Sequence, residues 1–178
     1  MSDKLQNLLQ QAWQARRDNR LADAHQAFTE AVALCRKTGE RRALIQSLKG
    51  LGQIERDLGH ADAAHPLYEE AVTHCRAEND TLQLAHTVRH LGDIHADMGH
   101  VELAESCYRE ALMLYGGQQR MAPLDFANAI RPLAILKERE GQNEEAIHLW
   151  RQARDLYAKV NVREGVAESS AHIAGLGG

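Results

Sequence analysis

The sequence repeats itself at an interval of forty residues. The segment LKGLGQIERDLGHADAAHPLYEEAV, which begins at Leu48, aligns with VRHLGDIHADMGHVELAESCYREAL, which begins at Val88. The pairs that coincide include Leu51 with Leu91, Gly52 with Gly92, Gly59 with Gly99, Ala64 with Ala104, Tyr68 with Tyr108, Glu70 with Glu110 and Ala71 with Ala111. A repeat of this length is a supersecondary unit that buries its apolar face only against its neighbours, so the sequence predicts a stacked array.

Two weaker copies extend the array to four units. Upstream, the pattern continues at Asn19, Ala24, Phe28 and Ala31. Downstream, after two extra residues around Gly116 and Gly117, it continues at Leu133, Ala134, Gly141, Ala146, Trp150 and Ala153. Four such units account for nearly the whole chain of 178 residues.

Each unit reads as a helical hairpin. Apolar residues recur at intervals of three and four, which is typical of amphipathic helices, and the turn glycine divides each unit in two. Only three prolines occur in the chain, which also favours helix. We therefore expect an all-α fold, an α-solenoid of four hairpins plus a C-terminal capping helix. The predicted helices are 4–17, 21–37, 42–58, 61–77, 81–98, 101–115, 123–140, 144–159 and 163–174.

Pro132 falls well inside one predicted helix. Proline has no backbone N–H, so one helical hydrogen bond is lost at this position. One interpretation is that the helix is kinked there and that the fourth unit is tilted. A tolerated irregularity is the other.

The spacing that recurs in each unit indicates how its two helices pack. Gly52 and Ala64 let the helices approach closely, and Tyr68 fills the space beside them. The segments "LGQI" and "LGDI", together with the A-x3-aromatic pairs, resemble the tetratricopeptide repeat (TPR). Those pairs are Ala24 with Phe28, Ala64 with Tyr68, Ala104 with Tyr108, and Ala146 with Trp150. The forty-residue spacing resembles the longer repeats of kinesin light chains and of bacterial regulatory repeat proteins. Two features depart from the TPR pattern: Leu48 and Glu55 stand where Trp and Tyr are usual, and the closing Pro is missing.

This resemblance implies a right-handed superhelix whose concave face is lined by the first helix of each unit and holds a peptide. We expect a single domain over residues 1–178, with repeats at approximately 4–40, 41–80, 81–120 and 123–160 and a capping helix at 163–174. When each unit is numbered so that Gly52 and Gly92 take the eighth place, the second, fifth, sixth, ninth, twelfth and thirteenth places face inward. Gly50, at a sixth place, is among these inward-facing residues.

The fifth place of these units predicts a basic row. It holds Leu9, Lys49, Arg89 and Arg131 in successive units. Arginine grips a carboxylate with two hydrogen bonds, so the row suggests a groove for an acidic peptide or protein segment. The predicted groove residues are Lys49, Gln53, Arg56, His86, Arg89, His90, Asn128 and Arg131.

Three other interpretations stay open. The groove cations could pair with Asp57, Asp93 and Asp97 in solvated ion pairs of small energetic value. The chain could be a self-associating structural or assembly module, such as a homodimer, because the exposed ends of repeat arrays tend to associate. It could also be the regulatory TPR domain of a larger signalling or transcription-regulatory system.

Catalytic and cofactor motifs are lacking in the sequence. There is no GxSxG, phosphate-binding loop, GxGxxG or HExxH, so we expect neither an enzyme nor a cofactor. His86, His90 and Asp93 have spacings that could place them on one helix face as metal ligands. Hydrogen bonding in the groove is the more economical explanation for both histidines, and we predict no metal site.

The charge balance bears on the class of partner. The formal charge is −4 at pH 7 and aromatic residues make up 4% of the chain, which argues against nucleic-acid binding. No segment approaches the roughly 18 apolar residues of a membrane span. We therefore expect a soluble, cytoplasmic protein whose partner is a protein or peptide.

Overall fold

The computed structural model describes residues 2–117 and 122–177, and it confirms the all-α solenoid. Over these residues the chain forms the following helices: α1 (Asp3–Arg17), α2 (Leu21–Thr38), α3 (Arg41–Asp57), α4 (Ala61–Glu78), α5 (Thr81–Asp97), α6 (Val101–Gly116), α7 (Pro123–Arg139), α8 (Asn143–Lys159) and α9 (Arg163–Gly175). Each helix end lies within one residue of its predicted position. The expected single domain and its repeat bounds stay a prediction, and residues 118–120 of the third repeat lie outside the described residues.

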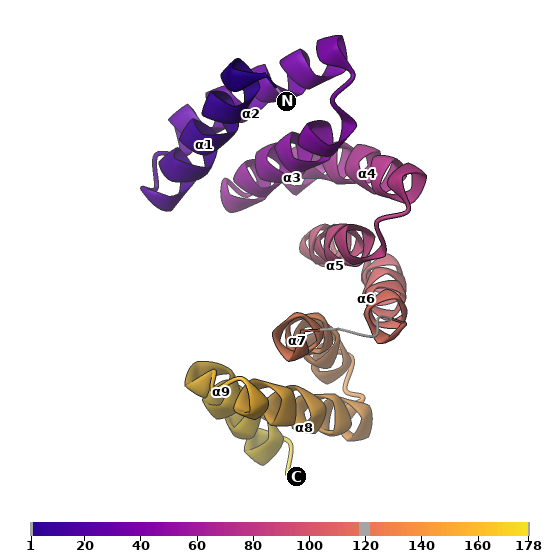
Figure 1. The fold of residues 1–178 in the computed structure, drawn as a ribbon. Coiled ribbons are helices and arrows are strands. Elements are labelled where there is room, and N and C mark those ends of the chain that lie inside the picture. The colour runs from indigo at the N-terminus through magenta and orange to yellow at the C-terminus, as the bar shows by residue number, and fades with distance from the viewer. Residues whose placement is uncertain (1, 118–121, 178) are drawn as a thin grey trace.

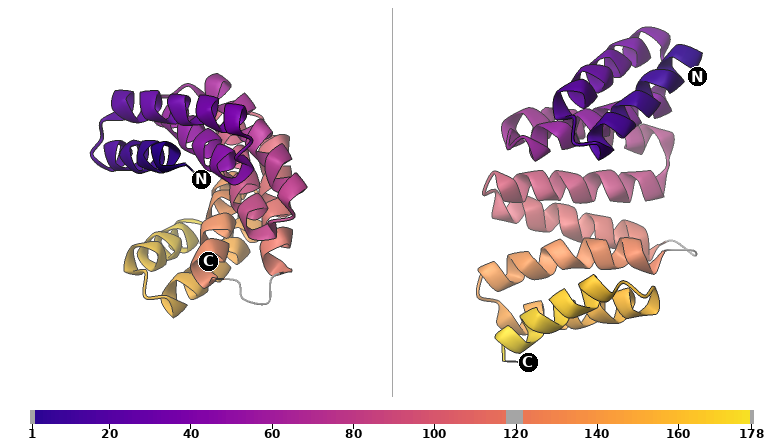
Figure 2. Two further views of the ribbon diagram at one scale, coloured as in Figure 1. Left: turned by 45° about the horizontal axis from the view of Figure 1, so that its top comes forward. Right: turned by 90° about the vertical axis from the view of Figure 1, so that its left-hand side faces the viewer.

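Each helix packs mainly against the one before it and the one after it in the chain. The result is a C-shaped stack in which α3, α5 and α7 lie on the inner side and α4 and α6 on the outer side (Figure 1). A side view shows the helices in successive layers from one terminus to the other (Figure 2). The inner helices therefore present their free faces to a common concave surface.

The turn between the two helices of each hairpin needs a left-handed residue. Gly59, Gly99 and Gly141 have φ values of 82°, 76° and 73°, and Asn19 takes the same place with φ 56°. The next amide then reaches back into the preceding helix, as in the 2.8 Å bond from His60 N to the Glu55 carbonyl. Glycine and asparagine tolerate this conformation best, which explains why the turn residue is repeated.

The predicted contact between small and aromatic residues is present. A Cβ atom added to Gly52 would come within 2.7 Å of the Tyr68 ring, and one added to Gly92 within 2.7 Å of Tyr108. Both tyrosines are almost fully buried. The glycine thus lets the aromatic ring lie directly on the backbone of the first helix.

The placement of Gly50 in the groove was wrong. Gly50 is buried beneath Phe28 of the preceding hairpin, whose ring would overlap any side chain there. Phe28 itself is fully buried. The sixth place therefore serves packing between neighbouring hairpins in this unit.

Pro132 does not interrupt its helix, since α7 runs continuously from Pro123 to Arg139. The last helix, α9, packs on α8 and covers the end of the stack. There the ring of His172 stacks on that of Trp150, with centroids 4.2 Å apart. None of the described helices is both long enough and apolar enough to cross a membrane.

Candidate functional site

The predicted basic row lies on the inner helices, with Lys49 on α3, Arg89 on α5 and Arg131 on α7. All three side chains are partly buried. Their environments differ, however, because carboxylates neutralise only two of the three. Lys49 is the exception: within the described residues no carboxylate lies within 4.0 Å of its ammonium group. Burial lowers the pKa of Lys49 and the charge of Arg89 acts in the same direction, whereas Cys75 and the more distant carboxylate of Asp80 oppose this shift.

Arg89 is held by two neighbours on its own helix. Its Nη1 donates to the Asp93 carboxylate at 3.1 Å, and its Nη2 donates to His90 Nε2 at 2.6 Å. His90 Nδ1 lies 3.3 Å from the same carboxylate. Arg89 is therefore oriented by a compact polar network, yet its Nη2 bonds to a neutral acceptor rather than to a second anion.

Asp93 is the centre of that network and is only 8% exposed. It also accepts a 3.1 Å hydrogen bond from the Tyr108 hydroxyl and lies 3.6 Å from Arg56. Burial acts to raise the pKa of Asp93, but the hydrogen bond from His90 and the charges of Arg89 and Arg56 hold it below its ordinary value. The Asp93 carboxylate is thus already occupied by contacts with Arg89, Tyr108 and Arg56.

His86 completes the cluster around Lys49 and Arg89. Its Nε2 lies 3.6 Å from Asp125 of α7, and its ring meets Tyr115 edge to face. Burial lowers the pKa of both His86 and His90, and the charges of Lys49 and Arg89 lower both further. We call Lys49, His86, Arg89 and His90 the cationic cluster.

The other predicted groove residues have partners within the protein. Arg131 forms two hydrogen bonds to Glu168 of α9, at 2.7 and 2.5 Å. Arg56 lies 2.5 Å from Asp97, and Gln53 donates to Asp57 at 2.8 Å. Asn128 accepts a 2.9 Å hydrogen bond from the Tyr157 hydroxyl. The structure thus brings four of the eight predicted residues into the cationic cluster and engages the others along the same face.

Sequence reasoning missed Glu168 and Tyr108 at this face. Glu168 could not be placed because the register of α9 against α7 was unknown. Tyr108 was assigned only to packing. Its ring does pack on Gly92, but its hydroxyl reaches Asp93.

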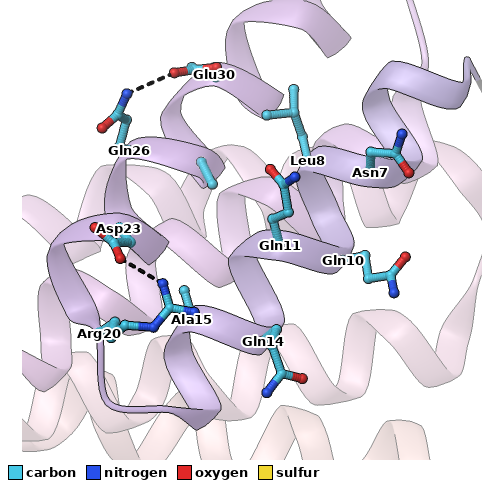
Figure 3. A pocket seen from close by; sticks show the side chains of 11 residues that line it. Asn7, Leu8, Gln10, Gln11, Gln14, Ala15, Arg20, Asp23, Gln26 and Glu30 are labelled. Atoms are coloured by element: carbon cyan, nitrogen blue, oxygen red, sulfur yellow. Dashed lines mark hydrogen bonds and ion pairs between the residues drawn. The ribbon is translucent and has the colours of Figure 1, made fainter.

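Two hollows bear on the choice of site. One, of about 150 Å³, lies on the concave face between α5 and α7 and is lined by Arg56, Asp93, Tyr108, Arg131 and Pro132, among others. A larger one, of about 600 Å³, lies between α1 and α2 and is lined by glutamines and Asn7 (Figure 3). At its edge the charges of Arg20 and Asp23 pair at 2.7 Å. The larger hollow therefore offers mainly amide groups and the carboxylate of Glu30, which accepts a 3.1 Å bond from Gln26, whereas the concave face carries the cationic cluster.

The possible metal ligands do not converge. His90 lies beside Asp93, but His86 is oriented toward Asp125 on another helix. Throughout 2–117 and 122–177, no group of three or more His, Cys, Asp or Glu side chains could hold a metal ion.

The repeats are recognised in sequence by two family models. A tetratrico peptide repeat model matches residues 52–98, and a tetratricopeptide repeat model matches residues 90–116. A search among curated proteins gives no significant match.

Solved structures share the fold over almost the whole chain. A putative kinesin light chain repeat protein from Podosopora anserina is 18% identical with a TM-score of 0.80, covering 99% of this chain and 87% of its own. A Rap protein complexed with Competence and Sporulation Factor is 14% identical with a TM-score of 0.84, covering 95% of this chain and 48% of its own. The Rap conjugation gene regulator of the plasmid pLS20, in complex with the Phr* peptide, is 21% identical with a TM-score of 0.80, covering 96% and 47%. With two repeat models matched between residues 52 and 116, and a solenoid fold shared with kinesin light chain-like and Rap proteins, the chain contains tetratricopeptide repeats.

Proposed function

We propose that this chain is a non-catalytic scaffold that binds a peptide or protein segment along its concave face and fixes an acidic group of that segment with Lys49 and Arg89. The observation that carries the proposal is the partly buried ammonium of Lys49, which has no carboxylate partner in the described part of the chain. A charge removed from water is stabilised when an opposite charge approaches it. An acidic ligand group would supply that charge.

The neighbouring groups favour the same ligand. Arg89 adds a second cation, while its partner Asp93 is already engaged by Tyr108 and Arg56. Two of the similar structures are Rap proteins, one complexed with Competence and Sporulation Factor and the other with the Phr* peptide, which supports a peptide as the ligand class. This chain spans 48% and 47% of those two chains, so a role as the regulatory domain of a larger system is the second candidate.

Lys49 is the better residue for a test than Arg89. Replacing Arg89 with glutamate would place a carboxylate beside Asp93, which is now 3.1 Å from the guanidinium, and would disturb the network itself. Lys49→Gln removes a charge that has no carboxylate within 4.0 Å among the described residues. Lys37→Gln is a matched control, because Lys37 is exposed on the outer-layer helix α2.

The experiment is a selection of displayed random dodecapeptides on the purified protein, followed by fluorescence anisotropy titrations of the selected peptides. We expect the peptides to be rich in aspartate and glutamate. We also expect them to bind Lys49→Gln about tenfold more weakly, a loss of about 1.4 kcal/mol, and to bind Lys37→Gln as they bind the wild type. Selected peptides without acidic residues, or equal binding to Lys49→Gln, would disprove the proposal.

A further inference from the structure

We infer that the binding of an acidic group at the cationic cluster is coupled to proton uptake by His86 and His90, so that the groove holds its ligand more tightly in mildly acidic solution. This inference rests on the proposed function and names how that site is regulated.

The two histidines lie on the same face of α5 as Arg89. Positions 86, 89 and 90 are three and four residues apart, which places them side by side on a helix. Lys49 approaches from α3, close enough for its charge to act on both rings. Any anion held between Lys49 and Arg89 therefore lies near both imidazoles.

His90 is neutral in the observed arrangement. Arg89 Nη2 can only donate, and it lies 2.6 Å from His90 Nε2 but 3.3 Å from Nδ1, so the shorter contact favours Nε2 as the acceptor, which then carries no proton. The remaining proton then resides on Nδ1, which lies 3.3 Å from Asp93. Protonation of Nε2 would break the bond to Arg89 and leave that branch of the guanidinium available to a ligand.

The groups that face the two rings are few. His86 faces Asp125 on α7, Tyr115 on α6, and the cations Lys49 and Arg89. His90 faces Asp93 and Arg89 on its own helix, Lys49 on α3, and the Tyr68 ring on α4 at 5.8 Å. Each ring thus has one carboxylate nearby and two cations that oppose its protonation.

The sign of the coupling follows from this balance. Burial and the two cations lower the pKa of His86 and His90 in the free protein, so both rings are neutral near pH 7. A bound carboxylate offsets the two cations and raises both values, so the complex binds more protons than the free protein. Affinity then increases as pH falls, by up to about tenfold for each unit by which one histidine shifts.

The probe is N-acetyl-hexa-aspartate, titrated by calorimetry at about pH 7.5 and about pH 5.5. Aspartate titrates near pH 3.9, outside this window, whereas a phosphate would titrate inside it and confuse the result. We expect at least about tenfold tighter binding at the lower pH. Near the midpoint of the transition, buffers of different ionisation enthalpy should report uptake of at least about half a proton.

Two variants separate the coupling from general effects of acid on the protein. His86→Gln/His90→Gln keeps hydrogen-bonding groups but cannot titrate, so its affinity should be the same at both pH values. His148→Gln on α8 is the matched control, because His148 is exposed and its hydrogen bond is to the neutral side chain of Gln152 on the same helix. This control should retain the full pH dependence.

The possible outcomes are distinguishable. Binding by the wild type that is equally tight at both pH values, or a double variant that keeps the pH dependence, overturns the proton coupling and leaves the proposed function intact. Failure of the probe to bind at either pH counts against an acidic ligand for this groove, and the inference fails with it.

Discussion

His65 and His95 meet edge to face at the junction between α4 and α5, with ring centroids 4.9 Å apart. His100 lies on the other side of His95, at 5.9 Å. His95 is 7% exposed, and its Nδ1 has no hydrogen-bond partner in the described part of the chain. Burial lowers the pKa of His95, His65 and His100 lower it further, and Glu69 opposes them.

The preceding hairpin has a glutamate at the position that is equivalent to His95. There Glu55 takes the place of His95, forty residues earlier, and lies 2.8 Å from His25 and 3.0 Å from His60. A carboxylate between two histidines is stabilised when they are protonated, whereas a histidine between two histidines is not. We therefore expect the junction between the second and third hairpins to lose stability in acid.

His95→Glu should stabilise the protein in mildly acidic solution. In the wild type, the pKa of His95 in the folded state lies below its ordinary value of 6.5, so the unfolded chain takes up the proton first and stability is lost as pH falls below about that value. Glutamate at 95 would face His65 and His100 as Glu55 faces His25 and His60. We expect a gain of about 1 kcal/mol at pH ~6, seen as a melting temperature roughly 2–4 °C higher.

At pH ~8 this gain should vanish, because that pH lies well above the ordinary imidazole pKa of about 6.5. His148→Glu on the exposed face of α8 is the control and should show no such difference between the two pH values. If His95→Glu changes the melting temperature by the same amount at both, the histidines do not act through their charge.

Gly50→Ala should destabilise the protein although alanine favours helix. The added methyl group would overlap the Phe28 ring, which is fully buried in the core. We expect a loss of about 2 kcal/mol in the free energy of unfolding, measured by urea denaturation. Gly175→Ala on α9, where nothing lies within 4 Å, should be neutral or slightly stabilising. Equal effects of the two changes would mean that the close contact with Phe28 is unimportant.

The helices could be predicted from the sequence because their signals are local. Apolar spacing and the turn residue at Gly59, Gly99 and Gly141 determine where each helix begins and ends. Gly50 was misplaced because helical periodicity alone does not show that the aromatic ring of the preceding hairpin covers that position.

The groove charges were only partly predictable. The pairs Arg16 with Asp57 and Arg56 with Asp97 are both 41 residues apart, so the repeat itself contained a signal for them. The bond between Arg131 and Glu168 contained none, since α9 has no second copy that reveals its register. The sequence therefore did not reveal that, among the described residues, Arg131 is paired with a carboxylate whereas Lys49 is not, and the three-dimensional structure was needed to show it.

Glu168→Gln should extend the cationic surface of the groove. Glu168 now accepts both hydrogen bonds from Arg131, so its carboxylate neutralises the third cation of the row. Without that charge, Arg131 becomes available to an acidic ligand. We expect N-acetyl-hexa-aspartate to bind about threefold to tenfold more tightly, with a gain that diminishes at high salt.

Glu164→Gln is the matched control on the same helix, because Glu164 is exposed in the first turn of α9. It changes the net charge equally but should leave affinity nearly unchanged. Similar gains in the two variants would show that overall charge, rather than the release of Arg131, governs binding.

Lys137 is a buried cation whose partners determine its contribution to stability. Its side chain is 4% exposed, and Nζ lies 2.7 Å from Glu105 and 2.9 Å from Glu140. Glu105→Gln leaves the buried charge undercompensated, so we expect a loss of about 2 kcal/mol in urea denaturation. Lys137→Met removes the charge and keeps the apolar stem, while Glu105 retains Arg109 at 2.7 Å, so its cost should be under about 1 kcal/mol. The double variant should accordingly be more stable than Glu105→Gln alone, because it no longer buries an undercompensated ammonium group. A double variant as unstable as that single variant would show that Glu105 acts through Arg109 rather than through Lys137.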